Sequence, residues 1–155
     1  MLQRIQTVYL FLVFVFGLLY LLLPLATLGV GHEVYTLKSY EVVAPERITA
    51  HVDVTFFRAV FLTVLFAHMI LTVITTYKYK KRLLQLKLGN LNLLLLLILI
   101  VLSFFYIDAI KNQIAAEVSY SVGLFFPFIS IILILLANRG IRKDEALIRS
   151  INRVR

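Results

Sequence analysis

The sequence predicts an all-α membrane protein with four transmembrane helices, both termini cytoplasmic, a short external loop and a basic amphipathic C-terminal helix. Three observations lead to this fold class. Hydrophobic residues make up 61% of the 155 residues, against roughly 45–50% in soluble domains. Charged residues make up only 15% and are gathered in short segments. Between those segments lie four apolar runs that meet the ~20 helical residues needed to cross a bilayer.

The four apolar runs cover residues 8–30, 55–77, 91–110 and 118–137. Helices are expected for them, because an open strand would leave its backbone N–H and C=O groups unpaired in lipid. The first run is longer than the ~7–15 apolar residues of a signal peptide, and no A-x-A-like cleavage site follows it. We therefore expect it to stay attached, so that residues 1–137 form one transmembrane domain.

Lysine and arginine are distributed unequally between the two sides of the predicted membrane. Of the 16, 12 lie in the N-terminus, in the connection between the second and third runs, or in the tail after residue 137. Because cytoplasmic segments of membrane proteins are rich in these residues, both termini are predicted to be cytoplasmic. The chain contains no cysteine, which excludes disulfides, thiolate metal sites and cysteine nucleophiles.

The external loop, residues 31–54, has the composition of a small β-structure. Residues 33–43 are rich in Val, Tyr and Thr, and residues 48–54 alternate between apolar and polar side chains, with Pro45 between the two runs. This pattern predicts a short β-hairpin over the outer mouth of the bundle. An isolated hairpin is only marginally stable in water, so we expect it to pack on the helices or on a partner.

The tail, residues 138–155, predicts a basic amphipathic helix. Its apolar face carries Ile141, Leu147, Ile148, Ile151 and Val154, and Arg142, Arg149 and Arg153 lie on another face. One interpretation is a helix that lies on an anionic inner leaflet. The other is a docking element for a cytosolic partner with an acidic surface or phosphates, RNA included. The candidate docking residues are Arg142, Lys143, Arg149, Arg153 and Arg155.

Motifs at both ends of the chain resemble those of a known family. They are Gln3-Arg-Ile-Gln-Thr7 and Arg142-Lys-Asp-Glu-Ala-Leu-Ile-Arg-Ser150, the latter followed by Arg153-Val-Arg155. They are similar to the signatures of a small four-helix inner-membrane family of Bacteroidota, the domain of unknown function DUF4293. The resemblance implies an inner-membrane protein with no assigned activity. Family members usually carry Ala where Gly140 stands and often Asp where Asn152 stands. Because Gly costs roughly 1 kcal/mol relative to Ala within a helix, Gly140 weakens the expectation of a stiff helix into the tail.

His68 is the ionisable residue nearest the middle of a predicted span. An ionisable residue in a span is a functional hypothesis by default, and histidine titrates near neutrality. One interpretation is therefore a proton-sensitive or ligand-contacting group. The other is a neutral imidazole that donates to a backbone carbonyl or to Ser103 or Ser130 on a neighbouring helix. The polar residues that share its helix face, expected to turn into the bundle, are Arg58, Thr72, Thr75 and Thr76.

Three further residues in the spans suggest specific structural roles. Arg58 and Asp108 are expected at similar depth near the outer face, where they would form an ion pair between the second and third helices. The alternative is an Arg58 side chain that reaches the headgroups without a partner. Pro127 is expected to kink the fourth span, because proline removes a backbone donor and clashes with the preceding turn.

The sequence lacks the motifs of the common enzyme classes. It has no phosphate-binding loop, dinucleotide fingerprint, zinc-protease motif or nucleophile elbow. A zinc set of His32, Glu33, His51 and Asp53 matches no established spacing, so no metal or cofactor is predicted. We therefore expect a non-catalytic accessory or scaffold subunit of a larger inner-membrane assembly, whose partners are the lipid bilayer and other membrane proteins. The alternative is a small channel, transporter, or lipid- or quinone-binding module centred on His68.

Overall fold

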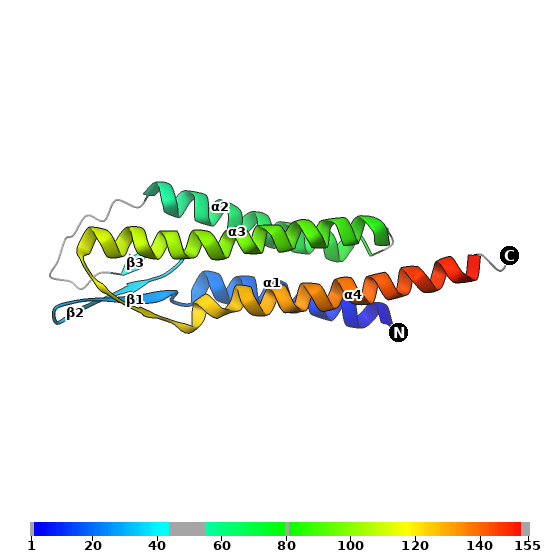
Figure 1. Ribbon diagram of the computed structural model, residues 1–155, viewed down its shortest axis with the longest axis horizontal. Coiled ribbons are helices and arrows are strands. Elements are labelled where there is room, and N and C mark those ends of the chain that lie inside the picture. The colour runs from blue at the N-terminus through cyan, green and yellow to red at the C-terminus, as the bar shows by residue number, and fades with distance from the viewer. Residues whose placement is uncertain (1, 44–54, 80, 153–155) are drawn as a thin grey trace.

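The computed structural model describes residues 2–43, 55–79 and 81–152. Four long helices dominate it: α1 (Leu2–Leu22), α2 (Thr55–Tyr77), α3 (Arg82–Ile114) and α4 (Phe126–Asn152). Within the described residues, four helices are long and apolar enough to cross a membrane, which confirms the predicted four-helix class. The helices run alternately up and down (Figure 1), so that α1 lies beside α2 and α4, and α3 lies beside the same two.

The bundle has two chemically different ends. One end carries the start of α1, the connection between α2 and α3, and the last turns of α4, which project beyond the other helices (Figure 1). We call this the basic end, because most of the lysines and arginines among the described residues lie there. The other end carries a small sheet, and we call it the sheet end.

Each helix buries a stripe of residues spaced alternately three and four positions apart. On α3 the stripe is Gln85, Gly89, Asn92, Leu96, Leu99, Ser103, Tyr106 and Ile110. On α2 it is Phe61, Leu65, His68, Thr72 and Thr75. On α1 it is Gln6, Leu10, Val13, Gly17 and Tyr20. This is the spacing of left-handed coiled coils and four-helix bundles, and it brings the four stripes together along one central seam.

The sheet is antiparallel and has the strand order β3-β2-β1-β4. Its strands are β1 (Ala26–Val30), β2 (Glu33–Leu37), β3 (Val42–Val43) and β4 (Glu117–Tyr120). Gly31 allows the tight β1–β2 turn, because its φ of +62° favours a residue without a side chain. The sheet packs on the end of α3, where Leu28 and Tyr35 join Tyr106 and Ile110 in one buried cluster.

This sheet corrects the ends of two predicted spans. The span 8–30 was too long, because α1 ends at Leu22 and residues 26–30 form β1. Pro24 explains the break, since proline cannot continue the hydrogen bonds of a helix. The span 118–137 began too early, because residues 117–120 form β4 and a 3₁₀ turn follows at Val122–Phe125. Periodicity alone cannot separate a buried apolar strand from a helix.

The β-structure predicted for residues 33–43 is confirmed, but as part of this sheet. Residues 33–43 contribute β2 and β3, which pair through Leu37 and Val42. The principal partner of β2 is instead β1, which comes from the apolar run assigned to the first helix. The second predicted strand, residues 48–54, lies outside the described residues.

Two expectations for α4 were wrong. Pro127 lies in the first turn of α4 and therefore ends no helix and produces no kink, since the first turn has no use for its missing N–H. Gly140 does not interrupt α4, which continues to Asn152. A Cβ at Gly140 would stand 3.1 Å from Gln6 Cγ on α1, so the glycine allows close contact between these helices.

Candidate functional site

His68 lies in the centre of the bundle, where its side chain is hydrogen-bonded to α3. Its Nδ1 lies 2.6 Å from Asn92 Oδ1, and both side chains are fully buried. Asn92 Nδ2 donates to Thr72 Oγ1 at 2.7 Å, and Thr72 Oγ1 donates to the backbone oxygen of His68 at 2.9 Å. The three side chains form a closed polar cluster, which we call the His68 cluster. Thr72 and Thr75 of the predicted inward face are buried with His68, whereas Arg58 and Thr76 are half-buried. The partner of His68 is Asn92 and not Ser103 or Ser130.

The hydrogen bonds of the His68 cluster fix the tautomer of the imidazole. Asn92 presents its oxygen to His68, so Nδ1 carries the proton and donates it. The lone pair is then on Nε2, which is buried and has no partner among the described residues. Gly17 of α1 covers the ring, since a Cβ there would stand 3.9 Å from His68 Cδ2. The site can accept one further hydrogen bond, but it is closed on the α1 side.

The other predicted intramembrane residues do not join this cluster. Ser103 accepts a hydrogen bond from the Tyr20 hydroxyl and donates to the Leu99 carbonyl at 2.6 Å. Arg58 and Asp108 make no ion pair with each other in the part of the chain that the structure describes. Asp108 is exposed and instead accepts from Asn112 Nδ2 at 3.1 Å, one turn along α3. The predicted ion pair between α2 and α3 is therefore wrong.

An ion pair occurs instead in the loop between β2 and β3. Lys38 Nζ lies 3.1 Å from Glu41 Oε1, and the backbone N–H of Lys38 donates to Glu41 O at 2.9 Å. The hydrogen bond to the Glu41 carboxylate, helped by the Tyr40 hydroxyl, raises the pKa of Lys38. The pair is only partly buried and contributes little stability. The backbone hydrogen bond beside it closes a tight turn.

A second polar cluster lies in the seam at the basic end, and it was not predicted. Gln6 Nε2 of α1 donates to Asp144 Oδ2 of α4 at 2.8 Å, in a buried position. Arg82 Nη1 at the start of α3 donates to the backbone oxygen of Asp144 at 3.0 Å. Gln85 Nε2 donates to the Thr75 carbonyl of α2 at 3.1 Å. These bonds join all four helices, and we call the set Gln6, Arg82, Gln85 and Asp144 the basic-end junction.

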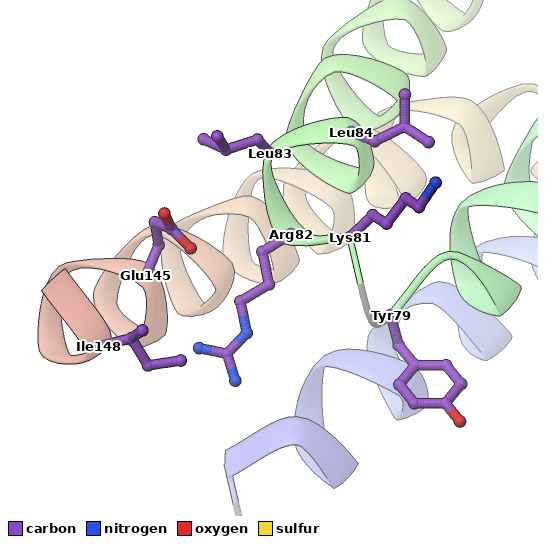
Figure 2. A pocket seen from close by; sticks show the side chains of 7 residues that line it. All are labelled: Tyr79, Lys81, Arg82, Leu83, Leu84, Glu145 and Ile148. Carbon is purple, nitrogen blue, oxygen red and sulfur yellow. The ribbon is translucent and has the colours of Figure 1, made fainter. Parts of the chain in front are cut away.

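Three adjoining cavities open around the basic-end junction. The first, about 670 Å³, lies between the start of α3 and the end of α4 (Figure 2). The second, about 560 Å³, shares Tyr79 and Arg82 with it and is also lined by Gln6 and Gln85. The third, about 430 Å³, continues from the second between α1 and α2. His68 lines none of the three.

The tail is a direct continuation of α4. Arg142 and Lys143 are exposed, as expected for docking residues. The backbone at Arg149 is helical, but its side chain and all of Arg153 and Arg155 lie outside the described part. Ile141 is buried in the bundle, while Ile148 on the predicted apolar face is 40% exposed. The apolar face of the tail is therefore divided between the bundle core and the surface.

The sequence contains a pattern that identifies Asn92 as an inward-facing residue of α3. Helix α3 is rich in leucine all round, so its hydrophobicity does not show which side is buried. Its polar and small residues, however, follow the three-and-four spacing of Gln85, Gly89 and Asn92, with Ser103 in the same register. Polar side chains within membrane helices face the protein interior. This register would have found Asn92.

The described residues contain no group of three or more His, Cys, Asp or Glu side chains that could hold a metal ion. Two of the possible zinc ligands in the sequence, His51 and Asp53, lie outside the described residues.

The chain belongs to the family called domain of unknown function DUF4293, whose model matches residues 2–154. The family predicted from the two terminal motifs is therefore confirmed. No curated protein and no solved structure matches the chain.

Proposed function

Starting from a family that has no assigned activity, we propose that this protein is a non-catalytic integral inner-membrane protein that serves as an accessory or scaffold subunit of a larger assembly. In this proposal both termini are cytoplasmic, as the unequal distribution of lysine and arginine predicts. The Bacteroidota origin implied by the resemblance stays a prediction. The tail acts as a docking element or lies on the membrane surface.

The observation that carries the proposal is the continuity of α4. Its 27 residues extend about 40 Å at 1.5 Å per residue, against a hydrocarbon core of ~30 Å. The excess lies at the basic end, where α4 projects beyond the other helices (Figure 1). Asp144 ties this part of α4 to α1 through Gln6 and to α3 through Arg82. A tail held in this way presents its exposed cations at a fixed place.

The interior of the bundle supports a structural role. The seam is filled by side chains, with Val13, Leu96 and Ile134 in contact at its middle. The polar groups of the His68 cluster bond to each other across α2 and α3. The unpartnered Nε2 of His68 is the observation that favours the alternative, a channel, transporter, or lipid- or quinone-binding module. Such a module needs access to His68, which Gly17 of α1 covers on one side in this arrangement.

The test is co-purification at native abundance. A tagged chain is extracted in mild detergent beside a variant truncated after Ala146, and the co-eluting proteins are identified by mass spectrometry. The truncation keeps Asp144 and so leaves the basic-end junction complete. We expect a defined set of proteins with the full chain and loss of at least one of them from the truncated variant. An equal set from both would show that residues 147–155 do not dock a partner.

A second variant separates specific docking from attraction to lipid. Arg142→Lys, Arg149→Lys and Arg153→Lys together keep the charge but remove the planar guanidinium groups. Lipid headgroups attract either cation, whereas paired hydrogen bonds to a carboxylate or phosphate need arginine. Release of a partner by this variant supports docking. Unchanged recovery of every partner would leave the tail as a membrane-surface helix.

A further inference from the structure

The second and third cavities form one groove between α1 and α2. Both are lined by Thr7 on α1 and by Thr76 and Tyr77 on α2. Along α1 the groove extends from Gln6 to Phe14, a distance of about 12 Å at 1.5 Å per residue. This is close to the ~15 Å that one leaflet contributes to the hydrocarbon core. We call it the lateral groove.

The chemistry of the lateral groove changes along its length. The end nearest the basic end is lined by Gln6, Arg82 and Gln85 with the Tyr79 ring. The deeper end is apolar, with Leu10, Phe11 and Phe14 on one wall and Val73 on the other. Phe11 is 61% exposed and Val73 is 37% exposed, so the groove opens sideways onto the surface that faces lipid in a membrane. An amphiphile with a polar head and an apolar chain matches this gradient.

Arg82 gives the polar end its charge. It is half-buried, and one of its guanidinium nitrogens is bonded to the Asp144 carbonyl, which holds the side chain in place. Figure 2 shows the guanidinium extending from the start of α3 into the space between Tyr79 and Ile148. The Asp144 carboxylate is occupied by Gln6. A held guanidinium with donors remaining is suited to paired hydrogen bonds with a phosphate.

We propose that the lateral groove binds one anionic phospholipid, with its phosphate on Arg82 and one acyl chain along Leu10, Phe11, Phe14 and Val73. The occupant is a lipid and not a soluble phosphate, because most of the groove wall is apolar and opens sideways. The inference rests on membrane insertion within the proposed function and not on the scaffold role. A lipid held there would cover the seam between α1 and α2 beside the basic-end junction.

The experiment is native mass spectrometry of the purified full chain in detergent, with added phosphatidylglycerol or phosphatidylcholine. The measured quantity is the ratio of protein with one bound lipid to free protein. We expect a preference for phosphatidylglycerol of about tenfold, because both lipids carry the phosphate but the choline cation of phosphatidylcholine is repelled by the Arg82 guanidinium. Arg82→Gln should reduce the preference to within about twofold. Val73→Trp should place a ring in the apolar part of the groove and so reduce the binding of both lipids.

Matched controls lie on the same protein. Lys87→Gln removes one exposed charge from α3, and Leu135→Trp adds a ring to the exposed face of α4; neither residue lines the groove. Both controls should bind as the wild type does. Equal binding of the two lipids by the wild type would overturn the proposal. So would an effect of Lys87→Gln as large as that of Arg82→Gln, or lipid binding that survives Val73→Trp.

A soluble competitor separates the two sources of phosphate. Glycerol 3-phosphate at the same concentration should leave the bound phosphatidylglycerol in place, because it lacks the acyl chain. Displacement would show that the site takes a soluble phosphate and that the lipid assignment is wrong. Because this measurement uses purified protein alone, its result does not depend on whether an assembly partner exists.

Discussion

The bond between His68 and Asn92 predicts a measurable energetic coupling between α2 and α3. His68→Leu removes the donor 2.6 Å from Asn92 Oδ1 and leaves that oxygen unpaired in a fully buried position. Asn92→Leu leaves the His68 Nδ1–H unpaired in the same way. An unpaired buried polar group costs about 1–3 kcal/mol, while an interhelical hydrogen bond in a membrane protein contributes about 0.6 kcal/mol on average. We therefore expect each single change to destabilise the fold by about 1–2 kcal/mol.

The double variant His68→Leu with Asn92→Leu should cost less than the sum of the two single changes. Neither orphaned group remains in it, so a coupling of about 1 kcal/mol is expected. The free energy of unfolding is measured by SDS titration in mixed micelles, followed by the near-ultraviolet circular dichroism of the tyrosines. Thr63→Ala is the control, because Thr63 is exposed and bonds only within its own helix, to Ala59. Additivity within about 0.3 kcal/mol would refute the coupling.

The same His68→Leu protein tests the alternative function, because it should insert and assemble normally if His68 is structural, and loss of activity in a stably inserted variant would favour the ligand or proton role. Topology is tested by cysteine labelling in a chain without native cysteine: His32→Cys should react with an impermeant reagent in intact cells with a permeabilised outer membrane, and Lys143→Cys should not. The reverse labelling would show that the termini are not cytoplasmic. Gly123→Ala should destabilise the protein by about 1–3 kcal/mol, because its Cβ would stand 2.3 Å from the Pro24 carbonyl oxygen. Gly29→Ala is the control, with nothing within 4 Å of its Cβ, and equal thermal stability of the two variants would contradict this reasoning.

Sequence patterns predicted α2 with the bounds that the structure gives, but they began α3 at residue 91 where the helix begins at Arg82, and they failed at one end of α1 and of α4. Helix α2 is an apolar run between polar segments, so its composition marks both limits. At the other two ends the apolar run continues from a helix into β1 or β4. These strands are apolar because β1 packs Leu28 into the cluster on α3 and β4 pairs beside it. That pairing joins residues about 90 positions apart, which no local pattern contains.

Of the two polar clusters, the sequence predicted the inward position of His68 and missed the basic-end junction. The inward face of α2 followed from the polar residues around His68, because the rest of that helix is strongly apolar. The basic-end junction was missed because its members lie on α1, α3 and α4, and a side chain such as Asp144 looks like an ordinary solvent-facing charge in a basic tail. Only the spacing of four and then three positions from Ala137 through Ile141 to Asp144 places that carboxylate on the buried stripe. Charge composition alone predicts that Asp144 faces solvent.

The uneven distribution of polar groups along the seam explains why the fold needs a sheet at one end. Helices in lipid gain little from burying apolar faces against each other, because the acyl chains are equally apolar. In the middle of the seam the His68 cluster, and at the basic end the basic-end junction, determine which faces meet. Toward the sheet end the seam is mostly apolar and aromatic, with Phe61 stacked on Tyr106, and side chains of this kind specify register weakly. There β1 bonds to β4, which fixes the end of α1 relative to the start of α4 through backbone hydrogen bonds. The sheet thus supplies at one end the specificity that polar side chains supply at the other.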